Sequence, residues 1–242
     1  MAVHLVVGGR WHDFDYARAR LIEALARRGV TAVSRDAWPG RLGSGDVLVT
    51  YTCDLRPDDR AQRLLVDFVD GGGRWLALHG SNAAIEPPEP GADRVFTTPD
   101  VLGRVPEVLG SRFLGHPPMA PYQVEVADPS HPLVAGIDAF ETRDELYVSE
   151  LYPPLQVLLH ARFSGACPSF ADGDTVDDEP RPVLYLRAFG QGEVTYLTLG
   201  HCRTLAELHE LGKDDATEPD HGSWELPEFR TLLERCLDRV LG

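Results

Sequence analysis

Histidine residues that follow apolar runs are the part of this sequence best suited to chemistry. His79 comes directly after the apolar run at residues 76–78, and Gly80, Ser81 and Asn82 follow it. A histidine carried to the end of a buried strand is well placed for acid–base work or metal ligation. The alternative is a structural histidine bonded to a backbone carbonyl. We predict Ser81 and Asn82 as substrate-binding residues, although Asn82 could equally hold its loop.

Further histidines lie in similar places. His201 follows an apolar run in the same way as His79, His116 stands in a turn before Pro117, and His12 follows the first pair of glycines. For His116 and His201 the choice is again between acid–base or ligand chemistry and a purely structural role. We predict that His12 contacts the substrate.

Two neighbouring carboxylates, Asp144 and Glu145, precede an apolar pair. One of them could orient a histidine, as carboxylates behind catalytic or ligating imidazoles do; the alternative is a pair of surface acids in a turn. Thiol nucleophiles at Cys53 or Cys202 are less favoured than cysteines that simply pack. The sequence contains no G-x-S-x-G, no G-x-G-x-x-G and no P-loop, so it does not support a serine hydrolase or a nucleotide site.

The elements that must position these residues follow a βαβ pattern. Patterning predicts strands at residues 3–7, 30–34, 46–51 and 75–78, and helices at 16–28 and from Pro57 to Gly71. These spacings indicate right-handed crossovers and a parallel sheet. Because the carboxyl ends of parallel strands share one edge, the segments that follow the strands should converge there. An antiparallel final hairpin would weaken that inference.

The remainder of the chain is patterned differently. Pro87, Pro88, Pro90 and Gly91 predict a long loop, and residues 164–181 a polar, acidic and mobile one. A helix is predicted at 101–109, short strands at 122–126, 145–147 and 157–161, a hairpin of 183–189 with 194–199, and a final helix at 227–240. We expect a single domain over residues 1–242, with a strand-rich elaboration at about 83–182.

Composition narrows the classes of partner. The net charge is −15, from 23 basic and 38 acidic residues, which disfavours nucleic acid. No stretch approaches the roughly 18 apolar residues of a membrane span. The four cysteines form no C-x-x-C pair, which argues against a zinc ribbon or a redox motif. With no signal-peptide pattern at the start, we expect free thiols and a cytoplasmic protein.

Five short motifs occur in order along the chain. They are GRWLALHG (73–80), LGSRFLGHP (109–117), HPLVAGI (131–137), DELY (144–147) and FGQGEV (189–194), the last leading to His201. With these motifs the chain resembles the ThuA-like (trehalose utilisation) family over about residues 3–241. The resemblance implies the flavodoxin-like α/β fold of class I glutamine amidotransferases, a mostly parallel sheet flanked by helices.

The resemblance also implies an activity and its limits. The corner that presents a cysteine nucleophile in the amidotransferases carries His79 here, so glutamine hydrolysis by that route is lost. Tyr185 and its neighbours stand where the family pattern has a tryptophan, and Glu193 stands near a basic position. These departures bear on the substrate more than on the fold. The implied role is in sugar catabolism, near the processing of 3-keto disaccharides or glycosides.

A keto group acidifies the neighbouring C–H bond, so a histidine base could start elimination at a glycosidic bond. A bound metal or a second histidine would stabilise the enediolate that forms. We assign His79 as base or metal ligand, and His116 and His201 as its partners or as ligands. Asp144 or Glu145 would orient these rings.

The sequence does not determine which cofactor, if any, the protein binds. One divalent ion, zinc or manganese, is the candidate, with His79, His116 and His201 as its ligands. Two other functions compete with the metal-free lyase: a metal-dependent hydrolase, and a non-catalytic sugar-binding or regulatory module on an inherited fold. The expected partner is a small-molecule sugar, with no nucleic acid and no membrane; a homo-oligomer is left open.

Overall fold

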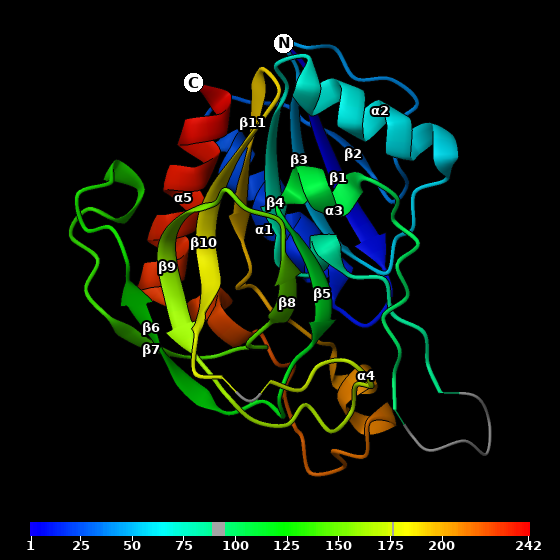
Figure 1. Cartoon of the computed structure of the whole chain (residues 1–242), viewed down its shortest axis with the longest axis vertical. Helices are drawn as coiled ribbons and strands as arrows, with labels where there is room; N and C mark the ends of the chain where they lie inside the picture. Colours follow the sequence, from blue (N-terminus) through cyan, green and yellow to red (C-terminus); the bar gives the residue numbers. More distant parts are fainter. Residues whose placement is uncertain (89–94, 176) are drawn as a thin grey trace.

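A central sheet, parallel in its first half, forms the frame of the molecule (Figure 1). The computed structural model describes residues 1–88, 95–175 and 177–242. The parallel strands, in spatial order, are β2 (Val33–Arg35), β1 (Val3–Gly9), β3 (Val47–Cys53), β4 (Arg74–Leu78) and β11 (Gly192–Leu197). Each neighbouring pair among them is parallel, so their carboxyl ends lie at one edge. The predicted parallel sheet is confirmed.

The second half of the sheet is antiparallel and comes largely from the elaboration. Beyond β11 it continues through β10 (Pro180–Phe189), β9 (Gln156–Arg162), β6 (Pro121–Val126) and β7 (Phe140–Arg143). A separate antiparallel pair is formed by β5 (Ser111–Gly115) and β8 (Val148–Leu151). The predicted final hairpin is confirmed as β10–β11. Because β11 is itself parallel to β4, the hairpin does not remove the end of β11 from the shared edge.

Side chains alternate along each strand, so the sheet presents apolar residues on both faces. Helices cover each of these faces. Helices α1 (Phe14–Ala26) and α5 (Pro227–Leu241) pack against strand residues such as Leu5 and Val49. Helices α2 (Asp59–Asp70) and α3 (Val105–Leu109) pack against the intervening residues, Val6 and Leu48 among them. The remaining short elements are α4 (Leu205–Glu210), η1 (His79–Asn82), η2 (Pro132–Val134) and η3 (Gly222–Glu225). The fold is therefore α/β, as predicted.

Two predicted elements differ in the structure. The helix expected at 101–109 begins only at Val105, because Gly103 takes a left-handed φ of 59° and Pro106 favours the first turn. Residues 145–147, expected as a strand, are an irregular link between β7 and β8. The Asp144 carboxylate accepts the Glu145 backbone N–H at 2.8 Å and turns the chain there. The four consecutive residues 144–147 of this link are all buried.

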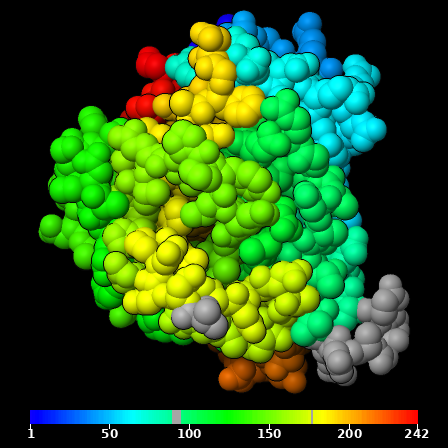
Figure 2. Space-filling view, in the orientation of Figure 1, coloured from blue at the N-terminus to red at the C-terminus, as the bar shows by residue number. Residues whose placement is uncertain are grey.

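The elaboration covers much of the molecular face seen in Figure 2, where its atoms are coloured green to yellow. The loop predicted at 164–181 is only partly a polar surface loop. Cys167 and Phe170 are buried, and Pro180 and Arg181 already belong to β10. Of the long loop predicted near residue 90, Pro90 and Gly91 lie outside the described residues. Among the residues described, no helix combines the length and the apolar character needed to cross a bilayer.

Candidate functional site

Sharp backbone corners stand at the carboxyl edge of the sheet. Trp11 after β1, Asp54 after β3 and His79 after β4 have φ angles of 81°, 53° and 47°. Among the described residues they are the non-glycine positions with positive φ. Side chains adopt this conformation at an energetic cost, and such residues gather at functional sites. These corners bring the residues around them over the edge of the sheet.

Three imidazole rings meet there. The ring centroid of His12 lies 4.6 Å from that of His79 and 5.4 Å from that of His201, and the last two are 5.9 Å apart. All three side chains are buried. The strand corners that the parallel pattern predicted to converge do so in the structure.

The carboxylate of Glu145 faces these rings from the link between β7 and β8. Its Oε2 lies 3.4 Å from His79 Nε2, and its Oε1 lies 3.2 Å from His201 Nδ1. The same Oε1 lies 3.5 Å from His116 Nε2 and 3.3 Å from the Arg203 guanidinium. Glu145 is therefore the central residue of the site, close to three histidines and to Arg203.

Burial and charge act in opposite directions on these groups. Burial disfavours the charged form of Glu145, but the imidazoles of His116, His201 and His79 around it hold the pKa of Glu145 well below its usual value. Burial lowers the pKa of His12 well below its usual value, and charge on His79 adds to the effect. Burial also lowers the pKa of His79, but the nearby Glu145 carboxylate outweighs this effect and raises that pKa. At neutral pH the site thus holds an ionised Glu145 and a neutral His12.

Several nitrogen atoms of this cluster have no hydrogen-bond partner although they are buried. They are both ring nitrogens of His12, Nε2 of His79 and both ring nitrogens of His201. His79 Nδ1 donates to the Thr198 carbonyl at 2.9 Å, so in the neutral ring the lone pair is on Nε2, next to the Glu145 carboxylate. One ligand atom from each of His12, His79, Glu145 and His201 lies within 4.8 Å of the others. Electron-pair donors crowded in this way fit a bound cation.

Asp144 does not face the rings as a base but binds the backbone behind them. Its carboxylate accepts the N–H groups of Gly200 at 2.9 Å and His201 at 3.2 Å, and the hydroxyl of Ser223. Its Oδ1 is also 4.0 Å from His79 Nδ1. Asp144 is thus a positioning residue that fixes the corner after β11.

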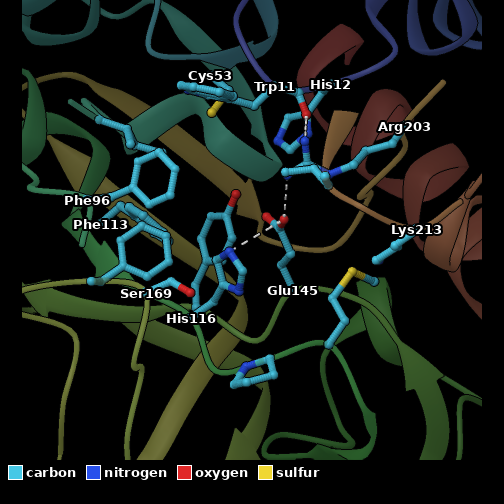
Figure 3. A pocket seen from close by; sticks show the side chains of 16 residues that line it. Trp11, His12, Cys53, Phe96, Phe113, His116, Glu145, Ser169, Arg203 and Lys213 are labelled. Carbon is cyan, nitrogen blue, oxygen red and sulfur yellow. Dashed lines mark hydrogen bonds and ion pairs between the residues drawn. The ribbon is translucent and has the colours of Figure 1, made fainter. Parts of the chain in front are cut away.

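A cavity of about 300 Å³ opens onto this cluster (Figure 3). In the close-up, Phe96 and Phe113 lie on one side, His12 and Arg203 on the other, and Glu145 between them. His116, Ser169 and Lys213 also line the cavity. One wall is therefore aromatic, and the opposite wall carries the titratable groups.

The predicted site residues are distributed unevenly around this cavity. His12, His116 and Glu145 line it, whereas His79 and His201 are fully buried behind them. Ser81 and Asn82 were expected to bind substrate, but they are not among the lining residues. The hydroxyl of Ser81 binds the backbone carbonyl of Leu78 at 2.7 Å, and the amide of Asn82 donates to Ser111 at 2.7 Å. The tight η1 turn points both side chains into the protein, away from the cavity, and substrate binding by either one stays a prediction.

Sequence reasoning missed several lining residues. Arg203 stands two residues after His201 and Tyr147 two after Glu145, so proximity to predicted site residues was their available signal. Trp11 next to His12 had the same signal. Phe113 and Phe170 gave none, because buried aromatic residues occur throughout protein cores.

The cysteines near the site are poorly suited to nucleophilic chemistry. Burial raises the pKa of the Cys53 thiol far above its usual value, although the residue lines the cavity. Burial raises the pKa of Cys202 to about 12, and its sulfur lies 3.1 Å from the Tyr51 hydroxyl. Thiols in the neutral form are weak nucleophiles.

Comparison with known proteins identifies relatives of this chain. The family model ThuA, described as trehalose utilisation, matches residues 5–210. No curated protein matches the chain. A solved ThuA-like protein from Parabacteroides merdae is 15% identical, with a TM-score of 0.67 over 99% of this chain and 89% of that one. A ThuA-like protein from Bacteroides uniformis is 15% identical, with a TM-score of 0.56 over 83% and 82%.

The fold also occurs as part of longer proteins. A β-galactosidase from Bacillus circulans sp. alkalophilus matches 99% of this chain with 30% of its own, at 12% identity and a TM-score of 0.52. At such identities these structures show a shared fold alone.

Proposed function

The chain belongs to the ThuA (trehalose utilisation) family, and on this premise we propose that it cleaves the glycosidic bond of a 3-keto glycoside by elimination. Membership of this family suggests a role in carbohydrate metabolism. The finer proposal, a lyase that acts on an oxidised sugar, rests on the chemistry of the site. It begins with removal of the proton beside the keto group, which that group makes acidic.

The observation that carries the proposal is the set of buried, unpartnered polar atoms around Glu145, next to a cavity. Unpaired polar groups in the interior destabilise a protein unless something compensates them. The three side chains of His12, His79 and His201 share this state in one place, beside the Glu145 carboxylate. A purely structural cluster would have paired them with backbone groups, as Asp144 is paired. A ligand-binding role explains why they are not.

We propose further that these four side chains hold one divalent ion, zinc or manganese. Three imidazoles and a carboxylate form a donor set that suits both ions. When bound, the ion would supply Lewis acidity toward an oxygen of the substrate. His116 was predicted as a ligand, but it lies outside this group, and His12 and Glu145 join it instead.

His116 is then the group best placed to move the proton. Its Nδ1 donates to the Pro117 carbonyl at 2.8 Å, which leaves the lone pair on Nε2, the atom near Glu145. His116 Nε2 takes the proton from C2 of the sugar, and the C–H electron pair forms the enediolate with C3. That electron pair then expels the glycosidic oxygen from C1, and this oxygen receives the proton from His116. Glu145 stabilises the imidazolium in between, and no water is consumed.

Two other lining residues assist. Arg203 donates to the Glu145 carboxylate and to the Trp11 carbonyl, so it fixes the carboxylate relative to the corner after β1. Burial raises the pKa of Tyr147 far above its usual value, and the charge of Glu145 adds to this. Tyr147 therefore keeps its proton and can donate a hydrogen bond to a sugar oxygen.

The test measures sugar released from 3-keto-trehalose and from a 3-keto-glucoside, with protein purified without a histidine tag. We expect His116→Ala to lower turnover about 100-fold or more. His160→Ala is the matched control, because it removes a histidine–glutamate pair with Glu125 (3.2 Å) outside the cavity and should retain full turnover. Equal turnover by His116→Ala would overturn its assignment. Saturable sugar binding without product would indicate the non-catalytic binding module.

The same preparations test the metal separately from activity. We expect elemental analysis to find about one zinc or manganese ion per chain, as one four-residue donor set implies. Glu145→Gln and His201→Ala should lose the ion, whereas His116→Ala should retain it. Addition of the ion should also raise the melting temperature of the wild type. Absence of both binding and stabilisation in the wild type would contradict the metal proposal.

A further inference from the structure

We infer that the leaving group of the substrate is aromatic, so that the site prefers a glycoside with an aryl aglycone to a disaccharide. This inference rests on the proposed function, because it names the class of glycoside that the same cavity takes. It follows from the chemistry of the aromatic wall, on the side of the cavity that holds Phe96 and Phe113.

Aromatic rings in mutual contact form that wall. Trp11 and Phe96 have ring centroids 5.7 Å apart, Phe96 and Phe170 also 5.7 Å, and Phe170 and Phe113 5.4 Å. Tyr147 continues the series at 4.6 Å from Phe113, and its ring lies 5.0 Å from that of His79. A continuous row of rings thus leads from the half-buried Trp11 to the histidine cluster.

The polar groups are gathered at the other side of the cavity. Arg203 can pair there with the hydroxyl and keto groups of one sugar ring, next to the ion that Glu145 and His12 would help to hold. On the aromatic side, Ser169 and His116 are the polar lining residues. A second sugar unit there would lose hydrogen bonds from water and recover few of them, and each unpartnered hydroxyl weakens binding.

An aryl group suits this wall in shape as well as in polarity. Neighbouring rings of the wall meet edge to face, with interplanar angles of 85° for Trp11 and Phe96 and 86° for Phe113 and Phe170. Aromatic rings favour such arrangements at centroid distances of about 4.5–7 Å. The cavity volume of about 300 Å³ stands at the lower end of the usual range for ligand sites. One sugar ring with one flat aglycone is a better match than an extended oligosaccharide.

The elaboration supplies most of this wall. Phe113 lies on β5, and Phe96 and Phe170 stand in segments on either side of the elaboration's own strands, joined by a bridge between them. The sheet corners supply His12, His79 and His201, whereas His116 and Glu145 come, like most of the aromatic wall, from the elaboration.

The test separates binding from turnover. Tryptophan fluorescence would report binding of phenyl glucoside, methyl glucoside and trehalose, none of which carries the keto group. We expect phenyl glucoside to bind about tenfold or more tightly than trehalose, from one to two aromatic contacts. Phe96→Ala should reduce this preference, since Phe96 is half-buried and tolerates truncation. The control Phe189→Ala alters a phenylalanine outside the cavity and should leave the preference unchanged.

The turnover arm compares 3-keto phenyl glucoside with 3-keto-trehalose, and kcat/KM should favour the phenyl compound by a similar factor. Equal or tighter binding of trehalose would overturn the aryl inference, even if both keto compounds are cleaved. Preferential phenyl binding with no cleavage of either compound would instead remove the proposed elimination and leave the aryl preference of the site in place.

Discussion

Asp144 shows how one side chain can determine the geometry of a site without touching the substrate. Its carboxylate accepts hydrogen bonds from the backbone of Gly200, His201 and Ser223, and from the N–H of Glu145. Glu145 and His201 come from separate parts of the chain and both belong to the proposed ion site. They are thereby tied to one anchor. The loss of this anchor should affect folding and the site together.

We predict that Asp144→Ala lowers the free energy of unfolding by about 3 kcal/mol or more, because several buried N–H groups lose their acceptor. Urea denaturation measures the change. Asp215→Ala, at an exposed position on the loop after α4, should stay within about 0.5 kcal/mol of the wild type. An Asp144→Ala variant as stable as the control would show that water replaces the carboxylate and that the anchor is dispensable.

At this scale the sequence predicts residue types better than their roles. The pattern identifies His79, His201, Asp144 and Glu145 by their place after or before apolar runs, and His116 by its place in a turn. Which of them faces the cavity depends on side-chain directions at strained corners, and no sequence pattern encodes these. His12 illustrates the point: its ring centroid lies 4.6 Å from that of His79, although the two residues are far apart in the chain.

The elements of the site are corners rather than helices or strands. At Gly80, the first residue after His79, an added Cβ would lie 2.7 Å from the Thr52 carbonyl oxygen and 2.9 Å from the Cys53 Cβ. The end of β3 and the corner after β4 therefore lie too close together for any side chain at position 80. This contact holds His79 against the neighbouring strand.

Gly80→Ala should consequently destabilise the protein by about 1–3 kcal/mol, the usual cost of overpacking, and weaken metal binding at His79. Gly45→Ala provides the control, since an added Cβ there meets nothing within 4 Å. Its stability should be unchanged or slightly higher, because alanine restricts the unfolded chain. Thermal unfolding of both variants measures the difference, and equal melting temperatures would refute the steric argument.

Helices and strands whose own sequence carries a clear pattern are predicted well. Elements that depend on distant partners are not. β1, β3, β4 and α5 combine apolar periodicity with glycine or proline at their ends, and the structure has them close to the expected bounds. The short strands β5, β7 and β8 lack such a pattern because their stability comes from partners far along the chain.

At the scale of the whole molecule, the four free thiols are buried in two different places. Cys202 and Cys236 belong to the large core between the sheet and helices α1 and α5. Cys53 and Cys167 belong to the small aromatic core beside the cavity, which the elaboration completes. Their reactivity can therefore distinguish opening of the elaboration from unfolding of the whole chain.

Burial raises the pKa of Cys167 to about 11, and those of Cys202 and Cys236 to about 12, from an ordinary value of 9.0. Because the folded state holds these protons more tightly than the unfolded chain, the stability linked to them is fully present below pH 9. It is lost as the pH rises from 9 through 11 and 12. Stability measured by urea denaturation should accordingly decrease with pH over this range.

At pH 8 we expect a thiol reagent to modify the native protein slowly, and to count four thiols at once in guanidinium chloride. Mass spectrometry should find Cys167 modified first, because the elaboration that buries it can open without the main core. Simultaneous modification of Cys167 and Cys236 would mean that the two cores open as one unit. The aromatic wall would then share the stability of the catalytic edge, and substitutions at Phe96 or Phe170 would lower the stability of the whole chain.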